Sequence, residues 1–132
     1  MSWKSWPRVV VIGDSLTEFG FESNGWTSLL ANSLSRKCDV INRGFGGYNT
    51  NHMRLVFDDV LKHSVNNSNT AAVTLFLGAN DAFLPDKAPK AHVPLEEYRD
   101  NLRVLAMRSC HIHLKIKNVT FLYLFIFDAH GL

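Results

Sequence analysis

The chain alternates short apolar runs with longer segments in which apolar residues recur at helical spacing. The runs at residues 9–12, 38–41 and 71–77 are predicted to be strands, because each is short and is followed by polar or glycine-rich residues. The run at 71–77 is nearly continuous in apolar character, which indicates a strand covered on both faces. A fourth run, at 119–127, is the last strand candidate.

Helices are predicted between and after these runs, because each intervening segment carries an apolar stripe. The stripes are Trp26, Leu29, Leu30 and Leu34 in the first helix, Met53, Val56, Phe57, Val60 and Leu61 in the second, and Tyr98, Leu102 and Leu105 in the third.

The second and third helices also carry start signals. Asn49 or Thr50 can cap the second helix, because a side-chain oxygen at this position accepts a hydrogen bond from a free backbone N–H. Pro94 is predicted to be the first residue of the third helix, where its missing N–H costs nothing. Glu96 and Glu97 then fall in the first turn, where the helix dipole favours negative charge.

This alternation of strands and helices predicts an α/β fold. We expect a three-layer α/β/α sandwich with a mainly parallel, doubly wound sheet of the flavodoxin-like type. One domain is expected to span residues 1–132, since the sequence has no repeats or linkers. The sheet is expected to be incomplete at the C-terminus, and its edge strand at 119–127 favours self-association.

Composition narrows the possible partners. The chain has 132 residues, 46% of them hydrophobic, which is enough for one buried core. The net charge of +2 is small and the basic residues are scattered, so no nucleic-acid partner is expected. No apolar run reaches the roughly 20 residues of a membrane-spanning helix, so no membrane span is expected.

Cysteine and histidine spacing indicates neither a disulfide framework nor a metal site. Cys38 and Cys110 are far apart in a sequence with no secretory signal, which predicts free thiols and a cytoplasmic location. No group of His, Cys, Asp and Glu has metal-ligand spacing, so we expect no metal and no cofactor.

Chemically useful residues follow the first strands of the predicted sheet. Ser15 comes directly after the first strand, a glycine-rich segment at 42–50 follows the second, and Asn80 lies just after the third. A glycine after a strand is usually only a turn residue, so each exit alone is weak evidence. The carboxyl ends of parallel strands meet at one edge, however, and together these residues supply a nucleophile and oxyanion donors for acyl transfer.

The same segments resemble a known family. Three segments resemble, in order, the first three sequence blocks of the SGNH, or GDSL, hydrolases: GDSLTEFG at 13–20, Gly47 within GFGGYNT at 44–50, and GAND at 78–81. The residues of these loops and the segment NDAFLP are similar to the sequences of the isoamyl acetate-hydrolysing esterase group. The resemblance covers about residues 8–107, and residues 108–132 form a divergent tail.

The resemblance implies a carboxylic ester hydrolase that acts on small or acyl-chain esters, lipid esters included. It implies that Ser15 is the catalytic nucleophile. The oxyanion hole is then formed by the backbone N–H groups of Ser15 and Gly47 and the side-chain amide of Asn80.

Neighbouring polar residues are expected to support these groups. Asp14 and Thr17 are expected to shape the turn that carries the nucleophile, and Asp81 to stabilise its loop through local hydrogen bonds. Asn42 is interpreted as a strand-end or turn residue.

The fourth block of the family, Asp-x-x-His, does not occur in the sequence. Asp128 and His130 follow the last strand candidate, but their spacing is one residue short and no helix follows them. The general base is therefore unknown, and we expect a truncated chain with impaired activity. The simpler interpretation of Asp128 and His130 is that they belong to a disordered chain end. The other histidines, interpreted as surface residues, are His52, His63, His92, His111 and His113.

Two alternatives to an active esterase remain open. The chain can be a non-catalytic product that keeps the pocket and binds esters, lipids or another protein. It can also be an unrelated flavodoxin-like module that binds phosphate, although its loops lack the lysine or the GxGxxG arrangement that such sites commonly use.

Overall fold

Residues 6–66 and 68–112 are described by the computed structural model of the 132-residue chain. The described residues contain a three-stranded parallel sheet in the order β2-β1-β3. The strands are β1 (Arg8–Gly13), β2 (Asp39–Gly44) and β3 (Thr70–Phe76). The helices are α1 (Ser15–Glu18), α2 (Trp26–Ser33), α3 (Thr50–Ser64) and α4 (Leu95–Ile112), and a 3-10 turn, η1 (Phe19–Phe21), follows α1.

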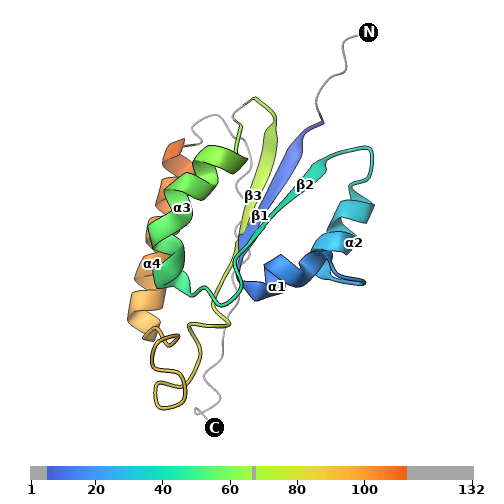
Figure 1. The fold of residues 1–132 in the computed structure, drawn as a ribbon. Coiled ribbons are helices and arrows are strands. Elements are labelled where there is room, and N and C mark those ends of the chain that lie inside the picture. The colour runs from blue at the N-terminus through green and yellow to red at the C-terminus, as the bar shows by residue number, and fades with distance from the viewer. Residues whose placement is uncertain (1–5, 67, 113–132) are drawn as a thin grey trace.

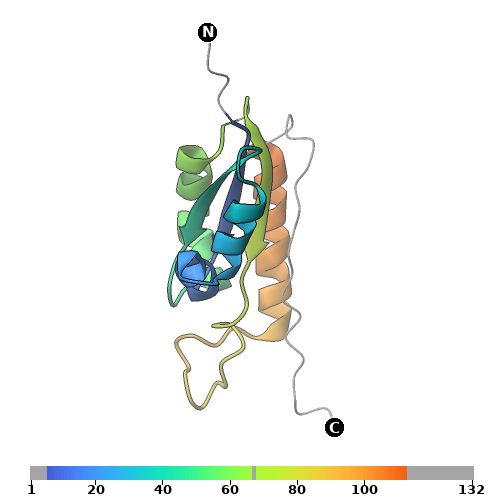
Figure 2. The same ribbon diagram turned by 90° about the vertical axis from the view of Figure 1, so that its right-hand side faces the viewer.

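Helices lie on both faces of this sheet. α3 and α4 pack side by side on one face, and α1 and α2 lie on the other (Figure 1); the perpendicular view shows the same layers (Figure 2). α2 links β1 to its neighbour β2, whereas α3 carries the chain from β2 past β1 to the opposite edge at β3. The predicted three-layer α/β/α sandwich with a parallel, doubly wound sheet is confirmed.

The main core lies between the sheet and the layer formed by α3 and α4. β1 contributes Val10 and Ile12, and α3 contributes Met53, Phe57 and Leu61, all of them fully buried. The three α3 residues are spaced four apart, so they form one stripe that faces the sheet. Burying a side chain of this size stabilises the fold by about 1.5–3 kcal/mol, so this stripe fixes α3 and the loop before it.

The opposite face of the sheet is covered in part by α2. The ring of Trp26 meets that of Phe76 edge to face, with the ring centroids 5.9 Å apart. Leu29, a member of the apolar stripe predicted for this helix, is 55% exposed. The fully buried residue of α2 is Thr27, whose side chain packs against Gly20 and occupies the space that a Gly20 side chain would need. The buried face of α2 therefore does not coincide with its apolar stripe.

β2 extends past the predicted strand at 38–41. Its last residues include Asn42 and Arg43, which the sequence placed in the following loop. Backbone pairing explains the difference, since Val11 of β1 is in register with Asn42, and Gly13 with Gly44. Apolar character marks the buried part of a strand, whereas ladder hydrogen bonds determine its length.

The caps of α3 and α4 differ in how closely they follow the prediction. Asn49 caps α3, because its side-chain oxygen accepts a hydrogen bond of 2.9 Å from the N–H of His52. α4 begins at Leu95, so Pro94 lies one residue before the helix and the prediction for it is wrong. Pro94 still contributes to the start, because its oxygen accepts a 2.8 Å hydrogen bond from the N–H of Tyr98.

Several predictions concern parts of the chain outside the described residues. The strand at 119–127, the pair Asp128 and His130, and His113 all fall there and stay predictions. Within the described part, both cysteines, Cys38 and Cys110, are free thiols as predicted. No helix in residues 6–66 and 68–112 has the length and apolar character needed to cross a membrane.

Candidate active site

The first strand exit places Ser15 at the start of a helix. β1 ends at Gly13 and α1 begins at Ser15. Asp14 lies between them and caps α1, because its carboxylate accepts a 2.9 Å hydrogen bond from the N–H of Leu16. A Cβ at Gly13 would overlap Thr17 and the main chain of β3, so the absence of a side chain allows helix and strands to approach. These contacts confirm that Asp14 and Thr17 shape the turn.

The second strand exit lies beside Ser15. The N–H of Phe45 donates a 2.9 Å hydrogen bond to the oxygen of Gly13, which joins the second loop to the first. A Cβ on Gly46 would lie 4.0 Å from the Cβ of Ser15. Gly47 follows with a φ of +78°, a left-handed conformation that residues with a side chain rarely adopt. The glycine-rich segment therefore turns directly next to the serine.

The third strand exit is fastened to the second by Asn80. Its side-chain amide donates a 2.8 Å hydrogen bond to the main-chain oxygen of Tyr48, the residue after Gly47. Ser15, Gly47 and Asn80, the predicted site residues, therefore lie on neighbouring loops at the carboxyl edge of the sheet.

Asp81 contacts a distant part of the chain in addition to the predicted local hydrogen bond, which its own backbone N–H donates. Its carboxylate accepts hydrogen bonds from the N–H of Thr50, over 3.0 Å, and from the Thr50 hydroxyl. The physical reason is that a carboxylate that is only 2% exposed needs donors, and the first turn of α3 has free N–H groups. Asp81 thus anchors the third loop to α3.

Asn42 also joins two loops, a role that the sequence interpretation missed. Its amide nitrogen donates a 2.7 Å hydrogen bond to the oxygen of Thr17, and its amide oxygen accepts a 2.8 Å bond from the N–H of Gly44. The available signal was an asparagine directly after the apolar pair Val40 and Ile41, at the start of the glycine-rich segment. Its side chain holds α1 against the end of β2.

Two buried carboxyl groups lie beneath these loops. Asp14 is 1% exposed and Asp81 is 2% exposed. Burial raises the pKa of both carboxyls above the usual value, and the charge of Asp81 raises the pKa of Asp14 further. Hydrogen bonds oppose the shift, from the N–H groups of Leu16 and Ala79 to Asp14 and from Thr50 to Asp81. The bond from Ala79 also joins the first exit to the third.

Tyr98 of α4 lies close to the same carboxyl groups. Its hydroxyl donates a 2.9 Å hydrogen bond to the main-chain oxygen of Leu77, the residue directly after β3. Burial, and then the negative charges of Asp81 and Asp14, raise the pKa of Tyr98 to about 12. The phenol is therefore neutral at physiological pH and holds α4 against the sheet edge.

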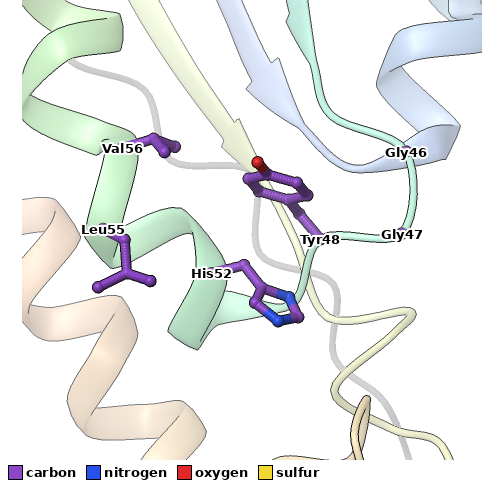
Figure 3. A pocket seen from close by; sticks show the side chains of 6 residues that line it. All are labelled: Gly46, Gly47, Tyr48, His52, Leu55 and Val56. Atoms are coloured by element: carbon purple, nitrogen blue, oxygen red, sulfur yellow. The ribbon is translucent and has the colours of Figure 1, made fainter.

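A shallow hollow of about 250 Å³ adjoins the second loop. Its lining residues come from that loop and from the outer face of α3 (Figure 3): Gly46, Gly47, Tyr48, His52, Leu55 and Val56. The Tyr48 ring stacks on Phe45 at 5.2 Å and lies 5.5 Å from the His52 ring, both measured between centroids. His52 is exposed and its Nδ1 accepts a 3.3 Å hydrogen bond from the N–H of Asn49.

The other described histidine side chains make contacts of their own. Nδ1 of His63 lies 2.8 Å from the oxygen of Asp59, and Nδ1 of His92 lies 2.7 Å from the oxygen of Phe83. Among the side chains described up to residue 110, no hydrogen bond joins a histidine to Ser15. The described residues also contain no cluster of three or more His, Cys, Asp or Glu side chains fit to hold a metal ion.

A parallel doubly wound sheet with a serine, a glycine turn and an asparagine on adjacent strand exits defines the SGNH class of α/β folds. Comparison with family models agrees, since the model described as the GDSL-like lipase/acylhydrolase family matches residues 11–123. The chain belongs to this family. The match extends past residue 107, and the division into a family-like part and a tail from 108 stays a prediction.

Curated relatives carry esterase names. The chain is 52% identical over 109 residues to the isoamyl acetate-hydrolyzing esterase 1 homolog of Rattus norvegicus, covering 81% of this chain and 44% of the relative. It is 37% identical over 116 residues to the isoamyl acetate-hydrolyzing esterase of Saccharomyces cerevisiae, covering 80% of this chain and 46% of the relative. The chain thus spans less than half the length of these relatives.

Solved structures share the fold. A G-D-S-L family protein from Desulfitobacterium hafniense DCB-2 is 26% identical with a TM-score of 0.62, over 88% of this chain and 57% of that one. A catalytic mutant of an acetylxylan esterase from Geobacillus stearothermophilus is 20% identical with a TM-score of 0.66, over 92% and 61% of the respective chains. The second similarity concerns the fold alone.

Proposed function

We propose that the chain carries the nucleophile and the oxyanion hole of a carboxylic ester hydrolase, with Ser15 as the nucleophile. The observation that supports this most directly is the close approach of the second loop to the first, where the position of a Gly46 Cβ is 4.0 Å from the Ser15 Cβ. Membership of the GDSL-like lipase/acylhydrolase family and the names of the relatives add support.

The proposed oxyanion hole consists of the backbone N–H groups of Ser15 and Gly47 and the side-chain amide of Asn80. That amide has two N–H bonds, and donation of one to the oxygen of Tyr48 leaves the other to face a substrate. Donors fixed in this way stabilise the charge that develops on the carbonyl oxygen, and one such donor is worth about 2.7–4 kcal/mol.

The proposed reaction has two acyl-transfer steps. Oγ of Ser15 attacks the ester carbonyl carbon while its proton passes to a base, and the carbonyl oxygen becomes an anion in the oxyanion hole. Re-formation of the C=O bond breaks the bond to the alcohol oxygen, and the alcohol leaves with the proton. Water then attacks the acyl-serine by the same route and releases the carboxylic acid.

The base for these steps is unassigned. The sequence contains no Asp-x-x-His block, and the pair Asp128 and His130 stays a prediction. Removing the histidine of a comparable triad costs on the order of 10⁶ in kcat. We therefore propose that Ser15 is placed to react but that this chain has little or no turnover.

The proposed substrates are small or acyl-chain esters, lipid esters among them. The names of the relatives make isoamyl acetate the first substrate to test. A cytoplasmic location is proposed on the basis of the free thiols of Cys38 and Cys110. Self-association through the apolar segment 119–127 is a further proposal, and size-exclusion chromatography that gives a monomer contradicts it.

The test of the nucleophile compares three proteins. Wild type, Ser15→Ala and the exposed-serine control Ser35→Ala are treated with an alkyl fluorophosphonate and assayed with isoamyl acetate and p-nitrophenyl acetate. Because the base is unassigned, we expect slow labelling of Ser15 in wild type and Ser35→Ala, none in Ser15→Ala, and little or no turnover in any of the three. Equal labelling of Ser15→Ala contradicts the assignment of the nucleophile, and rapid Ser15-dependent turnover contradicts the proposed low activity.

A second candidate function is a non-catalytic module that binds esters, lipids or another protein. Two observations favour this function. The loops of the site are joined by hydrogen bonds, and the sequence contains no Asp-x-x-His block. Its distinguishing result is a shift of the Gly47 and Asn80 NMR resonances on addition of isoamyl acetate, without release of acetate.

A further inference from the structure

A buried polar cluster connects α4 to the loop that carries Asn80. It consists of Asn101 in α4, Thr50 at the start of α3, and Asp81 in the third strand exit. Asn101 and Thr50 have no exposed surface, and Asp81 is 2% exposed. Buried polar groups are costly when they lack partners, so the hydrogen bonds within this cluster constrain all three side chains.

The side-chain amide of Asn101 has a fixed orientation. The guanidinium of Arg54 donates a 2.7 Å hydrogen bond to the amide oxygen. Because a guanidinium has no acceptor, this contact identifies the oxygen end of the amide and directs the nitrogen the other way. The nitrogen donates to the hydroxyl oxygen of Thr50, over 2.9 Å, and to the side-chain oxygen of Asn51, over 2.8 Å.

This orientation determines where the Thr50 hydroxyl donates. Since its oxygen accepts from Asn101, its single hydrogen is directed to the carboxylate of Asp81. The backbone N–H of Thr50 donates to the same carboxylate oxygen over 3.0 Å. Two donors from one residue therefore hold Asp81 at the first turn of α3.

Asp81 in turn determines the position of its neighbour. Asn80 directly precedes it, and the Asn80 amide reaches the oxygen of Tyr48, next to Gly47. A displacement of Asp81 is therefore expected to move two of the three proposed oxyanion donors, Asn80 and Gly47, relative to Ser15.

We propose that Asn101 is a positioning residue for the oxyanion hole, acting through Thr50 and Asp81 on Asn80 and Gly47. Its catalytic consequence rests on the proposed function of Ser15, whereas its effect on the loops does not. A leucine at position 101 fills a similar volume but provides no donor to Thr50. The Thr50 hydroxyl can then rotate away from Asp81, so the loop that carries Asn80 loses a restraint while the packing of the core is kept.

The test uses matched substitutions. Thr50→Val removes the hydroxyl at constant shape, and Thr50→Ser keeps it. Asn101→Leu removes the donor, and Ser109→Ala is the control on the same helix, because the Ser109 hydroxyl is also buried but donates only to Leu105, one turn earlier. Thermal unfolding identifies the variants that are folded at the assay temperature.

The first readout is the rate constant for labelling of Ser15 by the alkyl fluorophosphonate, whose phosphoryl oxygen occupies the oxyanion hole. Misplacement by about 1 Å can cost on the order of 100-fold in rate. We expect Thr50→Val and Asn101→Leu to label about 10- to 100-fold more slowly than wild type. Thr50→Ser and Ser109→Ala should label at the wild-type rate, because each keeps the contact to Asp81.

The second readout does not depend on reactivity. NMR spectra of ¹⁵N-labelled protein report the Asn80 side-chain amide and the Gly47 N–H directly, and we expect both to shift in Thr50→Val and Asn101→Leu but not in Ser109→Ala. If wild type is labelled no faster than Ser15→Ala, the proposed function is contradicted. The NMR result then decides whether Asn101 positions the loops. Unchanged Asn80 and Gly47 resonances in Thr50→Val overturn the inference, and if Asn101→Leu does not fold, the Thr50 pair decides.

Discussion

The side-chain amide of Asn80 donates a 2.8 Å hydrogen bond to the main-chain oxygen of Tyr48, and so fastens the third strand exit to the second. The second exit is itself joined to the first through Phe45 and Gly13. The loops that carry the proposed nucleophile and oxyanion donors therefore restrain one another, before any contribution from a substrate.

Asn80→Ala should separate reactivity from stability. The substitution removes a proposed oxyanion donor, so we expect the labelling rate of Ser15 to fall by about 10²–10³-fold. The half-buried side chain contributes little to the core, and the unfolding midpoint should change only slightly. Asn32→Ala, at an exposed position of α2, is the control. A labelling rate of Asn80→Ala equal to that of the control removes Asn80 from the oxyanion hole.

Gly44 and Gly47 should respond differently to alanine. A Cβ on Gly44 would overlap the main chain of Glu18, which cannot rotate away, so Gly44→Ala should lose more than about 3 kcal/mol of unfolding free energy or fail to fold. Within residues 6–66 and 68–112, no atom other than those of its chain neighbours lies within 4 Å of a Cβ placed on Gly47, and the φ of +78° is what opposes a side chain there. Gly47→Ala should therefore cost about 1–2 kcal/mol.

Gly47→Asn supplies the control for this comparison. Asparagine tolerates the left-handed conformation better than alanine, so it should cost less than Gly47→Ala. Urea unfolding measures all three variants. Equal losses for Gly44→Ala and Gly47→Ala would show that steric overlap with Glu18 is not the dominant effect.

The buried carboxyl of Asp81 should make stability depend on pH in a defined direction. Burial raises its pKa in the folded protein above the usual 3.8, so the folded state binds a proton more tightly than the unfolded state. This contribution to stability is fully present below pH 3.8 and is lost as the pH rises through the raised pKa.

Asp81→Asn removes that titration while keeping an oxygen that can accept from Thr50. The unfolding free energy of wild type minus that of Asp81→Asn should therefore become more positive as the pH is lowered from 7 to about 4. The pKa of Asp14 should also fall in the variant, because a nearby negative charge is gone. Urea unfolding over this range, with ¹³C NMR of the Asp14 carboxyl, checks both; a difference independent of pH contradicts the first.

Tyr98 should control the alkaline limit of stability. Its pKa of about 12 in the folded protein lies above the usual value of 10.0, so the contribution of Tyr98 to stability is present below pH 10 and is lost as the pH rises toward 12. In Tyr98→Phe this loss should be absent, and the stability difference between wild type and variant should decrease over that interval. Absorbance titration of the phenolate provides an independent check, and a Tyr98 titration near pH 10 contradicts the prediction.

Periodicity predicted the layers of this fold because burial and secondary structure are coupled at each position. The apolar stripe at Met53, Phe57 and Leu61 faces the sheet as the sequence indicates. Leu29 does not, because the packing of Thr27 against Gly20 determines the inner face of α2. Such a contact depends on tertiary geometry, which a local pattern does not contain.

The candidate site shows the same division. Ser15, Gly47 and Asn80 could be proposed from motifs, since each stands at a strand exit. The roles of Asn42 and Asp81 could not, because their partners, Thr17 and Thr50, lie 25 and 31 residues away in the sequence. Side-chain hydrogen bonds between loops become visible only when the pairing of the strands is known.

The strand order also has a consequence for how the site forms. Gly13 is in register with both Gly44 and Phe76, so β1 lacks one of its partners until β3 has been made and docked. Pairing of β1 with β3 is slow, because closing so long a loop of chain costs conformational entropy. During synthesis Ser15 emerges well before Asn80, and a nascent chain that ends before position 80 has the serine but no complete oxyanion hole. Reactivity of Ser15 toward a fluorophosphonate should therefore appear late in folding, together with long-range strand pairing. The rate at which this reactivity appears then measures the rate of strand pairing.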